Sequence, residues 1–365
     1  MTTDLILVID RRDTRVELNG KALCVRHGDA PPEHVPLGVL GQVIVHGKAL
    51  IACDVWRALA ERGIPGVLLP ARGRSPAALV GAALGATIEL RTAQHRAADR
   101  PELALSIARR LLAAKLDAQR RAALHLAAAS TGAAAAPNAL AALTAALDEA
   151  GDKLQRARTV GTLMGFEGGA AGAWYRWLAG WLPDAWQFAG RNRRPPRDPV
   201  NVLLSLGYTL LGGEMLAAVQ RQGLDPARGF LHGIVPGRES LVLDLIEPLR
   251  PSVDCVVLGL LDSVLVPADF TTGTTGCQLG KDGRERFYRA WAQARRDWPD
   301  LAALPAVPAA SAPADRDTAT ADPHPAAATA QTDAVDATDT SLPQLCGRRV
   351  DTLRRWLKPA LPQAE

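Results

Sequence analysis

The sequence has few cysteines, and their spacing matches no recognisable motif. Five occur among 365 residues, at positions 24, 53, 255, 277 and 346. The number is odd and no Cys-x-x-Cys pair is present, so the spacing indicates neither a disulfide framework nor a zinc site. We therefore expect reduced thiols and a cytoplasmic location.

Long apolar runs and a secretion signal are also missing. The longest apolar runs, such as Cys255–Leu261, are interrupted by charge well before the roughly 18 residues that a membrane-spanning helix needs. The first residues, Met-Thr-Thr-Asp, do not form a basic region followed by an apolar one. We expect neither a leader segment nor a membrane partner.

Signature motifs of several enzyme classes do not occur. There is no Gly-x-Ser-x-Gly and no His-Glu-x-x-His. The pair Gly280-Lys281 is followed by Asp282 and preceded by Thr275 at the position where a phosphate-binding loop requires glycine. These absences argue against a serine hydrolase, a zincin and a nucleoside triphosphatase.

Charge is distributed unevenly along the chain. The formal net charge is +4, but residues 301–342 hold six Asp and one Arg, so the remainder carries 42 − 1 = 41 basic and 38 − 6 = 32 acidic residues, or +9. Most of the basic residues are arginine, which binds phosphate through two parallel hydrogen bonds. A polyanionic partner is compatible with this pattern, although an Arg- and Ala-rich chain can also reflect a GC-rich genome.

The pattern of apolar residues predicts an α+β protein with a small N-terminal β-rich domain (1–88) and a mainly α-helical catalytic domain (89–300). In the first domain we expect a hairpin over Thr14–Val25 with a type I′ turn at Asn19-Gly20. The other elements expected there are strands at Leu5–Ile9, Val43–Ala52 and Gly66–Leu69 and a short helix at 54–62.

Beyond residue 90 the apolar period becomes helical, with one run at 138–160. Asp198-Pro199 is a typical start for a further helix, which should extend to about Gln220. Residues 301–342 consist largely of Ala, Pro, Thr and Asp without periodicity, which predicts a disordered linker. Residues 343–365 predict a basic amphipathic helix that docks on the protein or, as the less favoured alternative, on nucleic acid.

An imidazole and two carboxylates stand out in the segment 229–251. His232 precedes Asp244 by twelve residues, and Glu247 follows three residues later, inside the apolar run Leu241–Leu249. Buried carboxylates are costly unless a positive group binds them, and a divalent metal is the simplest such group. If the segment is helical with Ser240 as its cap, both acids share a face, although Pro248 bends the chain there. Caps, salt bridges or a satisfied core histidine are the alternative.

Glu167 lies in a predicted helix of small residues, Gly165–Ala173, where packing alone does not explain a carboxylate, although a surface glutamate remains the alternative. Carboxylates with one imidazole suit Mg²⁺ or Mn²⁺. Nearby, Arg193, Arg194 and Arg197 form a proline-stiffened basic segment, either a DNA contact or a solvated loop. Asn201, Ser205 and Tyr208 make a polar stripe on the following helix, which suits support around a buried site.

Together these segments resemble the CRISPR-associated integrase family, CRISPR-associated protein one. The resemblance spans nearly the whole chain and rests on four ordered motifs, at Gly165–Tyr175, Arg193–Leu211, Gly229–His232 and Gly237–Pro251. It implies a β domain joined to a helical catalytic domain. It also implies a metal held by Glu167, His232 and Glu247, with Asp244 beside them as a further catalytic residue and Tyr175 among the supporting residues.

In that family, homodimers assemble with CRISPR-associated protein two on double-stranded DNA, both protospacer fragments and the CRISPR repeat. The resemblance therefore implies an endonuclease and integrase that inserts spacers by attack of a 3′-hydroxyl on a phosphodiester. Two alternatives stay open: a catalytically silent DNA-binding scaffold of the same architecture, and a small-molecule metallohydrolase. Salt-dependent DNA binding would count against the second alternative.

Overall fold

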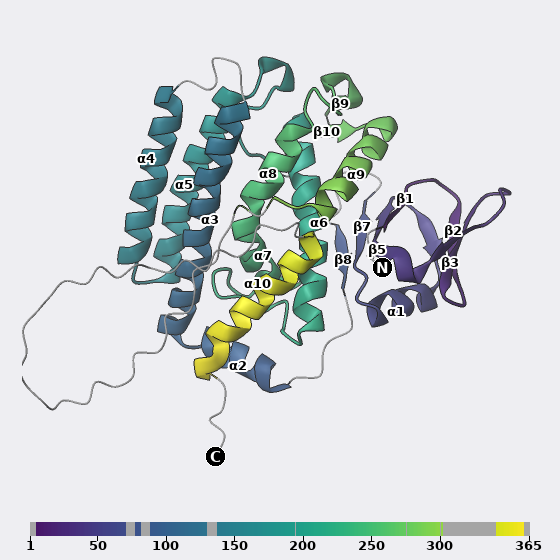
Figure 1. Ribbon diagram of the computed structural model, residues 1–365, viewed down its shortest axis with the longest axis horizontal. Coiled ribbons are helices and arrows are strands. Elements are labelled where there is room, and N and C mark those ends of the chain that lie inside the picture. Colours follow the sequence, from purple (N-terminus) through teal and green to yellow (C-terminus); the bar gives the residue numbers. More distant parts are fainter. Residues whose placement is uncertain are drawn as a thin grey trace, which may run out of the picture.

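A computed structural model describes residues 5–70, 77–81, 88–129, 137–193, 195–274, 276–299, 301 and 341–360. Strands dominate at the start and helices afterwards, which confirms the predicted α+β class. In Figure 1 the strands of the N-terminal part gather with helix α1 (Cys53–Glu61) on one side, and the long helices form the larger body beside them.

The N-terminal part contains two four-stranded sheets. The first has the order β1-β5-β7-β8, and its strands are β1 (Leu5–Ile9), β5 (Leu40–His46), β7 (Gly66–Leu69) and β8 (Ala78–Val80). The second has the order β4-β3-β2-β6, and its strands are β2 (Thr14–Asn19), β3 (Ala22–His27), β4 (Glu33–Pro36) and β6 (Ala49–Ile51). Strands β1, β5 and β7 run parallel, whereas β2, β3 and β4 are antiparallel.

The first sheet lies between two hydrophobic cores. Side chains alternate between the faces of a strand. Accordingly, Val43 and Val45 of β5 belong to the small core of the N-terminal part, while Ile44 between them belongs to the core of the helical part. Helix α1 (Cys53–Glu61) covers the small core with Val55 and Leu59. This double burial explains the three consecutive apolar residues Val43, Ile44 and Val45 in β5.

The predicted hairpin forms, but its turn lies one residue later than expected. Strand β2 pairs with β3 so that Asn19 lies opposite Ala22, which leaves Gly20 and Lys21 as the loop. Only Gly20 of these residues has a left-handed backbone, with φ of 59°. A type I′ turn requires positive φ at both central residues, so the predicted turn at Asn19-Gly20 was wrong.

The helical part is built around α6. Its helices are α2 (Ile88–Ala98), α3 (Pro101–Ala129), α4 (Pro137–Arg156), α5 (Val160–Trp181), α6 (Pro199–Arg221), α7 (Ser240–Ile246), α8 (Arg250–Gly259), α9 (Lys281–Arg296) and α10 (Leu342–Leu357), with a hairpin of β9 (Phe270–Gly273) and β10 (Gly276–Leu279). Helices α3, α4 and α5 pack on one another at the edge of this body (Figure 1). Helix α6 contacts α7, α8, α10 and the first sheet.

Helix α6 begins as its sequence predicts and then runs through the interior. The Asp198 side chain accepts a hydrogen bond from the backbone N–H of Asn201, at 2.8 Å, and Pro199 occupies the first turn. Among the described residues α6 is the one helix long and apolar enough to cross a membrane by length and composition, but 78% of its apolar window is buried in the protein. A central core helix meets the same criteria.

A buried arginine links the two parts of the molecule. The guanidinium of Arg295 on α9 donates to the carboxylate of Glu214 on α6 at 2.5 Å, and also to the backbone carbonyl of Gly41 on β5 at 3.1 Å. The side chains of Arg295 and Glu214 are each only 2% exposed. The sheet and the helices are therefore connected by polar contacts as well as by the shared apolar face of β5.

The segment that holds the two sequence-predicted acids turns twice. Helix α7 ends at Ile246, a 3-10 turn η4 (Glu247–Leu249) contains Pro248, and α8 starts at Arg250. Asp244 therefore lies in α7, whereas Glu247 begins the 3-10 turn that contains Pro248, so the two acids fall on either side of a helix boundary. Ser240 was expected to cap this helix, but it is the first helical residue, and its hydroxyl donates to the carbonyl of Gly233 at 2.8 Å.

The C-terminal helix α10 lies across α6 and near α2 (Figure 1). Its apolar residues, among them Leu345, Val350, Leu353 and Trp356, join the core of the helical part. The guanidinium of Arg110 on α3 also lies over the Trp356 ring, 5.2 Å from its centroid. The helix packs on the protein through its apolar face. The predicted linker at 301–342 lies almost wholly outside the described residues.

Candidate functional site

Two of the predicted acids meet on a single ammonium group. Glu167 lies in α5 and Glu247 in η4, and both carboxylates accept hydrogen bonds from Lys115 Nζ on α3, at 2.5 Å and 2.6 Å. The side chains of Lys115 and Glu247 are each 8% exposed, and that of Glu167 is 26% exposed. Three elements distant in sequence thus bring two carboxylates to one point near the surface.

The charges at this point determine its protonation state. Burial would raise the pKa of the Glu247 carboxyl, but Arg250, Lys115 and His232 outweigh burial and lower that pKa to about 2. Burial would likewise lower the pKa of the Lys115 ammonium, but Glu247 and Glu167 raise it above its ordinary value. Glu247 is therefore ionised and Lys115 protonated at neutral pH.

Asp244 organises the loop that carries His232. Its carboxylate accepts backbone N–H groups from Phe230 at 2.6 Å, Leu231 at 2.9 Å and His232 at 2.9 Å. It also lies 2.7 Å from His232 Nδ1. Because an ionised carboxylate can only accept, Nδ1 must carry the proton in this contact, which leaves the lone pair of Nε2 free.

Gly229 makes this arrangement possible. A Cβ atom at position 229 would lie 2.7 Å from Asp244 Oδ2 and 2.9 Å from the carbonyl oxygen of His232. Such contacts are far closer than van der Waals packing allows, so only glycine permits the carboxylate to approach the loop backbone. The motif Gly229–His232 and Asp244 therefore form one structural unit.

The predicted metal set is only partly brought together. Glu167 and Glu247 share Lys115, and His232 is close enough to Glu247 to lower its pKa. In the part of the chain that the structure describes, no three His, Cys, Asp or Glu side chains are close enough to hold an ion. The donor types nevertheless fit: two carboxylates share Lys115, and Nδ1 of His232 is held by a carboxylate, as in many metal-binding histidines. The ligand set remains a prediction.

The predicted supporting residues fall into two groups. Tyr208 donates to the buried carboxylate of Asp254, and its hydroxyl lies 3.2 Å from that of Tyr175. The guanidinium of Arg250 lies over the Tyr208 ring, 4.7 Å from its centroid, and pairs with Glu247 at 3.0 Å. Tyr208 contacts Arg250, which pairs with Glu247, and Tyr175 contacts Tyr208. Both tyrosines therefore support Glu247 indirectly.

Asn201 and Ser205 instead hold the basic loop before α6. The guanidinium of Arg191 donates to Asn201 Oδ1 at 2.6 Å and to Ser205 Oγ at 3.1 Å. It also lies over Tyr208, 5.5 Å from the ring centroid. Within the polar stripe of α6, Asn201 and Ser205 therefore bind Arg191, whereas Tyr208 contacts both Arg191 and Arg250.

Of the three arginines predicted to bind DNA, Arg193 and Arg197 are exposed, and Arg194 lies outside the described residues. The guanidinium of Arg191 instead donates to Asn201 and Ser205 of α6. Pro195 and the neighbouring Pro196 carbonyl contact the hairpin of β9 and β10, where Cys277 donates its backbone N–H to Pro196 at 2.8 Å. The hairpin thus holds the loop at Pro196, and Arg193 and Arg197 on either side are exposed to solvent.

Three functional residues escaped the sequence-based reasoning. Lys115 stands four residues after Leu111 and three after Leu112, so it lies on the apolar face of its helix, where a lysine needs a buried partner. Arg250 and Asp254 follow Glu247 at helical spacing. Burial raises the pKa of Asp254 to about 6, although the Tyr208 and Trp174 hydrogen bonds oppose this.

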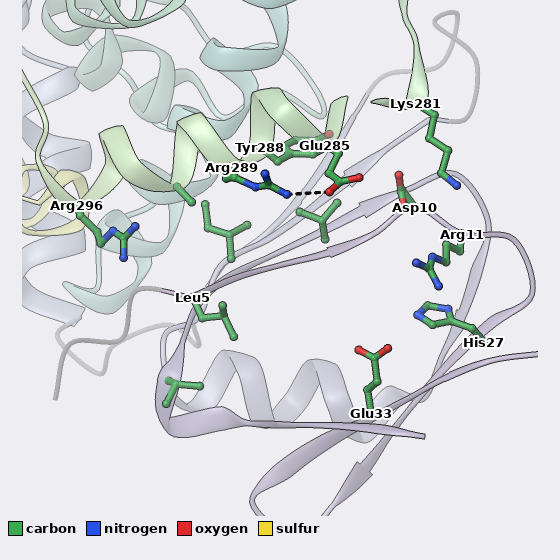
Figure 2. A pocket seen from close by; sticks show the side chains of 14 residues that line it. Leu5, Asp10, Arg11, His27, Glu33, Lys281, Glu285, Tyr288, Arg289 and Arg296 are labelled. Atoms are coloured by element: carbon green, nitrogen blue, oxygen red, sulfur yellow. Dashed lines mark hydrogen bonds and ion pairs between the residues drawn. The ribbon is translucent and has the colours of Figure 1, made fainter. Parts of the chain in front are cut away.

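A separate hollow lies between β1 and α9 (Figure 2). It has a volume of about 740 Å³ and contains none of the predicted site residues. Figure 2 shows acidic Asp10 and Glu33 and basic Arg11 and Lys281 around it. Glu285 and Arg289 of its wall pair with each other at 2.9 Å. Both charge signs are mixed along its walls, so its electrostatics select no particular ligand.

Comparisons with known proteins agree on one family. Residues 7–293 match the sequence profile of the family described as CRISPR associated protein Cas1. The CRISPR-associated endonuclease Cas1 2 of Rhodospirillum rubrum is 36% identical over 294 residues, covering 78% of this chain and 84% of that protein. A second relative, the CRISPR-associated endonuclease Cas1 1 of Thermodesulfovibrio yellowstonii, is 30% identical over 79% of this chain and 91% of its own length.

Solved structures share the fold. A Cas1 protein from Thermotoga maritima superposes with a TM-score of 0.74 at 19% identity, over 99% of this chain and 100% of that chain. A casposase bound to its integration product has a TM-score of 0.72 at 19% identity, over 100% of this chain and 93% of that chain. At such identities the similarity shows the architecture alone.

Proposed function

Because the chain belongs to the Cas1 family of CRISPR-associated proteins, we propose that it is a metal-dependent DNA endonuclease and integrase that inserts short DNA fragments into a CRISPR array. Its relatives are named CRISPR-associated endonucleases, and the casposase of the same fold is bound to an integration product. The observation that carries the proposal is the meeting of Glu167 and Glu247 at Lys115 Nζ.

In the proposed reaction the 3′-hydroxyl oxygen of a DNA fragment attacks a phosphorus atom of the repeat. The new phosphorus–oxygen bond joins the fragment to one side of the cut strand, and the strand piece on the other side leaves through its 3′-oxygen. The attacking hydroxyl gives up its proton to solvent and the leaving 3′-oxygen takes one up from solvent, so the step balances. Mg²⁺ or Mn²⁺ held by Glu167, His232 and Glu247 would supply Lewis-acid activation and offset the negative charge. Asp244 contributes by fixing the His232 ring with Nε2 as a free acceptor.

The DNA would approach from the side of the exposed arginines. Arg193 and Arg197 are exposed on a loop stiffened by two prolines, and such a loop loses little conformational entropy when it binds phosphates. The Arg191 contacts fix the base of that loop against α6. We therefore assign double-stranded DNA, both fragment and repeat, as the substrate.

Protein partners belong to the same proposal. A Cas6-RT-Cas1–Cas2 complex has the same fold over 98% of this chain, with a TM-score of 0.75 at 21% identity. This supports CRISPR-associated protein two as a partner. Among the described strands only β5 pairs with β1, and Leu5 on β1 is 47% exposed. An open strand edge of this kind offers backbone hydrogen bonds to another chain, which supports a homodimer.

Replacing Glu167 with Gln tests the enzymatic role. Strand transfer of a short duplex into repeat DNA with Mn²⁺ should fall by about 100-fold or more, because a ligating charge is lost while the shape is kept. The matched control is Glu149→Gln on α4, whose carboxylate is 68% exposed and pairs only with Lys153 in its helix. Full strand-transfer activity of the Glu167→Gln variant would contradict the proposal. If the wild type binds DNA but catalyses no strand transfer, the silent scaffold is favoured.

A further inference from the structure

Lys115 occupies the place at which a cation would bridge the two acids. Its Nζ lies 2.5 Å from Glu167 Oε1 and 2.6 Å from Glu247 Oε2. Mg²⁺ binds carboxylate oxygens at about 2.1 Å, so an ion between the same oxygens would require each to move by only about half an ångström. The ammonium and the ion would then overlap, and both cannot be there together.

We propose that Lys115 is a built-in counter-ion that fills the metal position until a divalent ion displaces it. This inference rests on the proposed function, because it takes Glu167 and Glu247 as the acids that receive the ion. Lys115 acts on the reaction through these carboxylates and is therefore a positioning residue. Its ammonium keeps them in place and neutralised before the metal arrives.

The buried environment explains why such a counter-ion is needed. Glu247 is 8% exposed, and a buried carboxylate without a partner is strongly destabilising. Arg250 already binds the other oxygen of this carboxylate, Oε1, at 3.0 Å. Arg250 can therefore hold Glu247 in the same position whether Lys115 or a metal ion occupies Oε2.

The geometry of lysine suits a displaceable group better than arginine would. Its ammonium is a compact charge on a flexible four-carbon stem, whereas a guanidinium binds carboxylates as a rigid fork. Glu167, the second partner, has 26% of its side chain exposed, so the site opens toward solvent on that side. The ammonium can move in that direction while its helix α3 stays packed against α5 and α8.

The consequence is competition between Lys115 and the metal. Each metal ion that binds must break two charge-assisted hydrogen bonds, so the wild type should bind the ion more weakly than the carboxylates alone would. Removing the ammonium while keeping the apolar stem should then tighten metal binding. It should also make the metal-free protein less stable, because the two acids lose their shared partner.

The test measures Mn²⁺ binding to the purified full chain without DNA, by calorimetry and by electron paramagnetic resonance of free Mn²⁺. Lys115→Met should bind Mn²⁺ about tenfold more tightly than the wild type, or about 1.4 kcal/mol. Its melting temperature should be lower than that of the wild type in EDTA, and Mn²⁺ should raise it more. The matched control, Lys153→Met, removes a lysine that is 47% exposed on α4, and it should change neither quantity.

Equal or weaker Mn²⁺ binding by Lys115→Met would overturn the inference. A Glu167→Gln variant separates this failure from failure of the proposed function, because it should lose Mn²⁺ affinity whether or not Lys115 competes. If Glu167→Gln and the wild type bind Mn²⁺ alike, the metal assignment itself is wrong. Should Lys115→Met not fold, a crystal structure of the wild type with Mn²⁺ decides: Lys115 Nζ displaced from both carboxylates supports the inference, and Nζ still between them refutes it.

Discussion

Replacing Asp244 with Asn tests whether this residue acts by organising the His232 loop. The wild-type carboxylate accepts backbone N–H groups at both oxygens, from Phe230 and Leu231 at one and from His232 at the other. An asparagine has only one carbonyl oxygen, and its NH₂ group must face at least one of these donors. In either orientation, one or two buried backbone N–H groups are left without an acceptor.

The magnitude follows from this count. An unsatisfied buried donor costs about 1–3 kcal/mol, and the remaining hydrogen bonds lose the assistance of the negative charge. We therefore expect Asp244→Asn to lower the free energy of unfolding by about 3 kcal/mol. Asp244→Ala, which leaves all three backbone donors unpaired, should cost more. Gly229→Ala should destabilise similarly, because its Cβ would lie 2.7 Å from Asp244 Oδ2.

Asp244→Asn should also change the tautomer of His232. With the asparagine NH₂ group facing Nδ1, the imidazole becomes an acceptor at Nδ1 and carries its proton on Nε2. A protonated Nε2 cannot bind a metal, so strand transfer should fall even at temperatures at which the variant is fully folded. Urea unfolding followed by circular dichroism gives the stability, and Mn²⁺-dependent transfer gives the activity.

Asp148→Asn is the matched control. Asp148 is 60% exposed and pairs with Arg120 on the surface, so its neutralisation should change the free energy of unfolding by less than about 0.5 kcal/mol. If Asp244→Asn costs less than about 1 kcal/mol and keeps full activity, the role assigned to the carboxylate is refuted.

Two further predictions concern the buried acid and the basic loop. Burial raises the pKa of Asp254 from 3.8 to about 6, so the folded state favours the protonated carboxyl. The contribution of this group to the free energy of unfolding is therefore complete below pH 3.8 and is lost as the pH rises. Of this contribution, about 1 kcal/mol is lost between pH 5 and pH 7, and the free energy of unfolding does not change further above pH 7 through this group. Thermal unfolding over this range should show that loss, and Asp254→Asn should remove it; an unchanged slope would contradict the pKa. Arg193→Ala and Arg197→Ala should each reduce the slope of log binding constant against log salt by about 1, whereas Arg289→Ala, which is 78% exposed and paired with Glu285, should not.

Much of the fold could be predicted from local patterns because helix starts and strand pairings are determined by residues that are neighbours in the sequence. The start of α6 at Asp198-Pro199 and the pairing of β2 with β3 depend on one helix cap and one turn. The predicted position of the turn was wrong because the presence of Gly20 does not show whether the residue before it or the residue after it shares the loop. Likewise Ser240 looked like a cap, but the distant carbonyl of Gly233 competes for its hydroxyl.

The candidate site was harder to predict because its contacts are long-range. Sequence motifs predicted Glu167, His232 and Glu247 as site residues, yet nothing local shows that Lys115 reaches two of them from another helix. The polar stripe on α6 was recognised, but its partner Arg191 comes from the preceding loop and is fixed only by tertiary packing. A lysine on an apolar helical face is the sort of local contradiction that indicates a buried partner.

The docking of α10 on α6 has a consequence for biosynthesis. Because α10 supplies core residues such as Leu353 and Trp356, the apolar surface of α6 and α2 stays partly uncovered until the chain has been made as far as Leu357. A nascent or prematurely terminated chain that ends before Leu342 would expose that surface to other proteins. Chaperone dependence and aggregation of truncated products are therefore expected to depend on whether α10 has been synthesised.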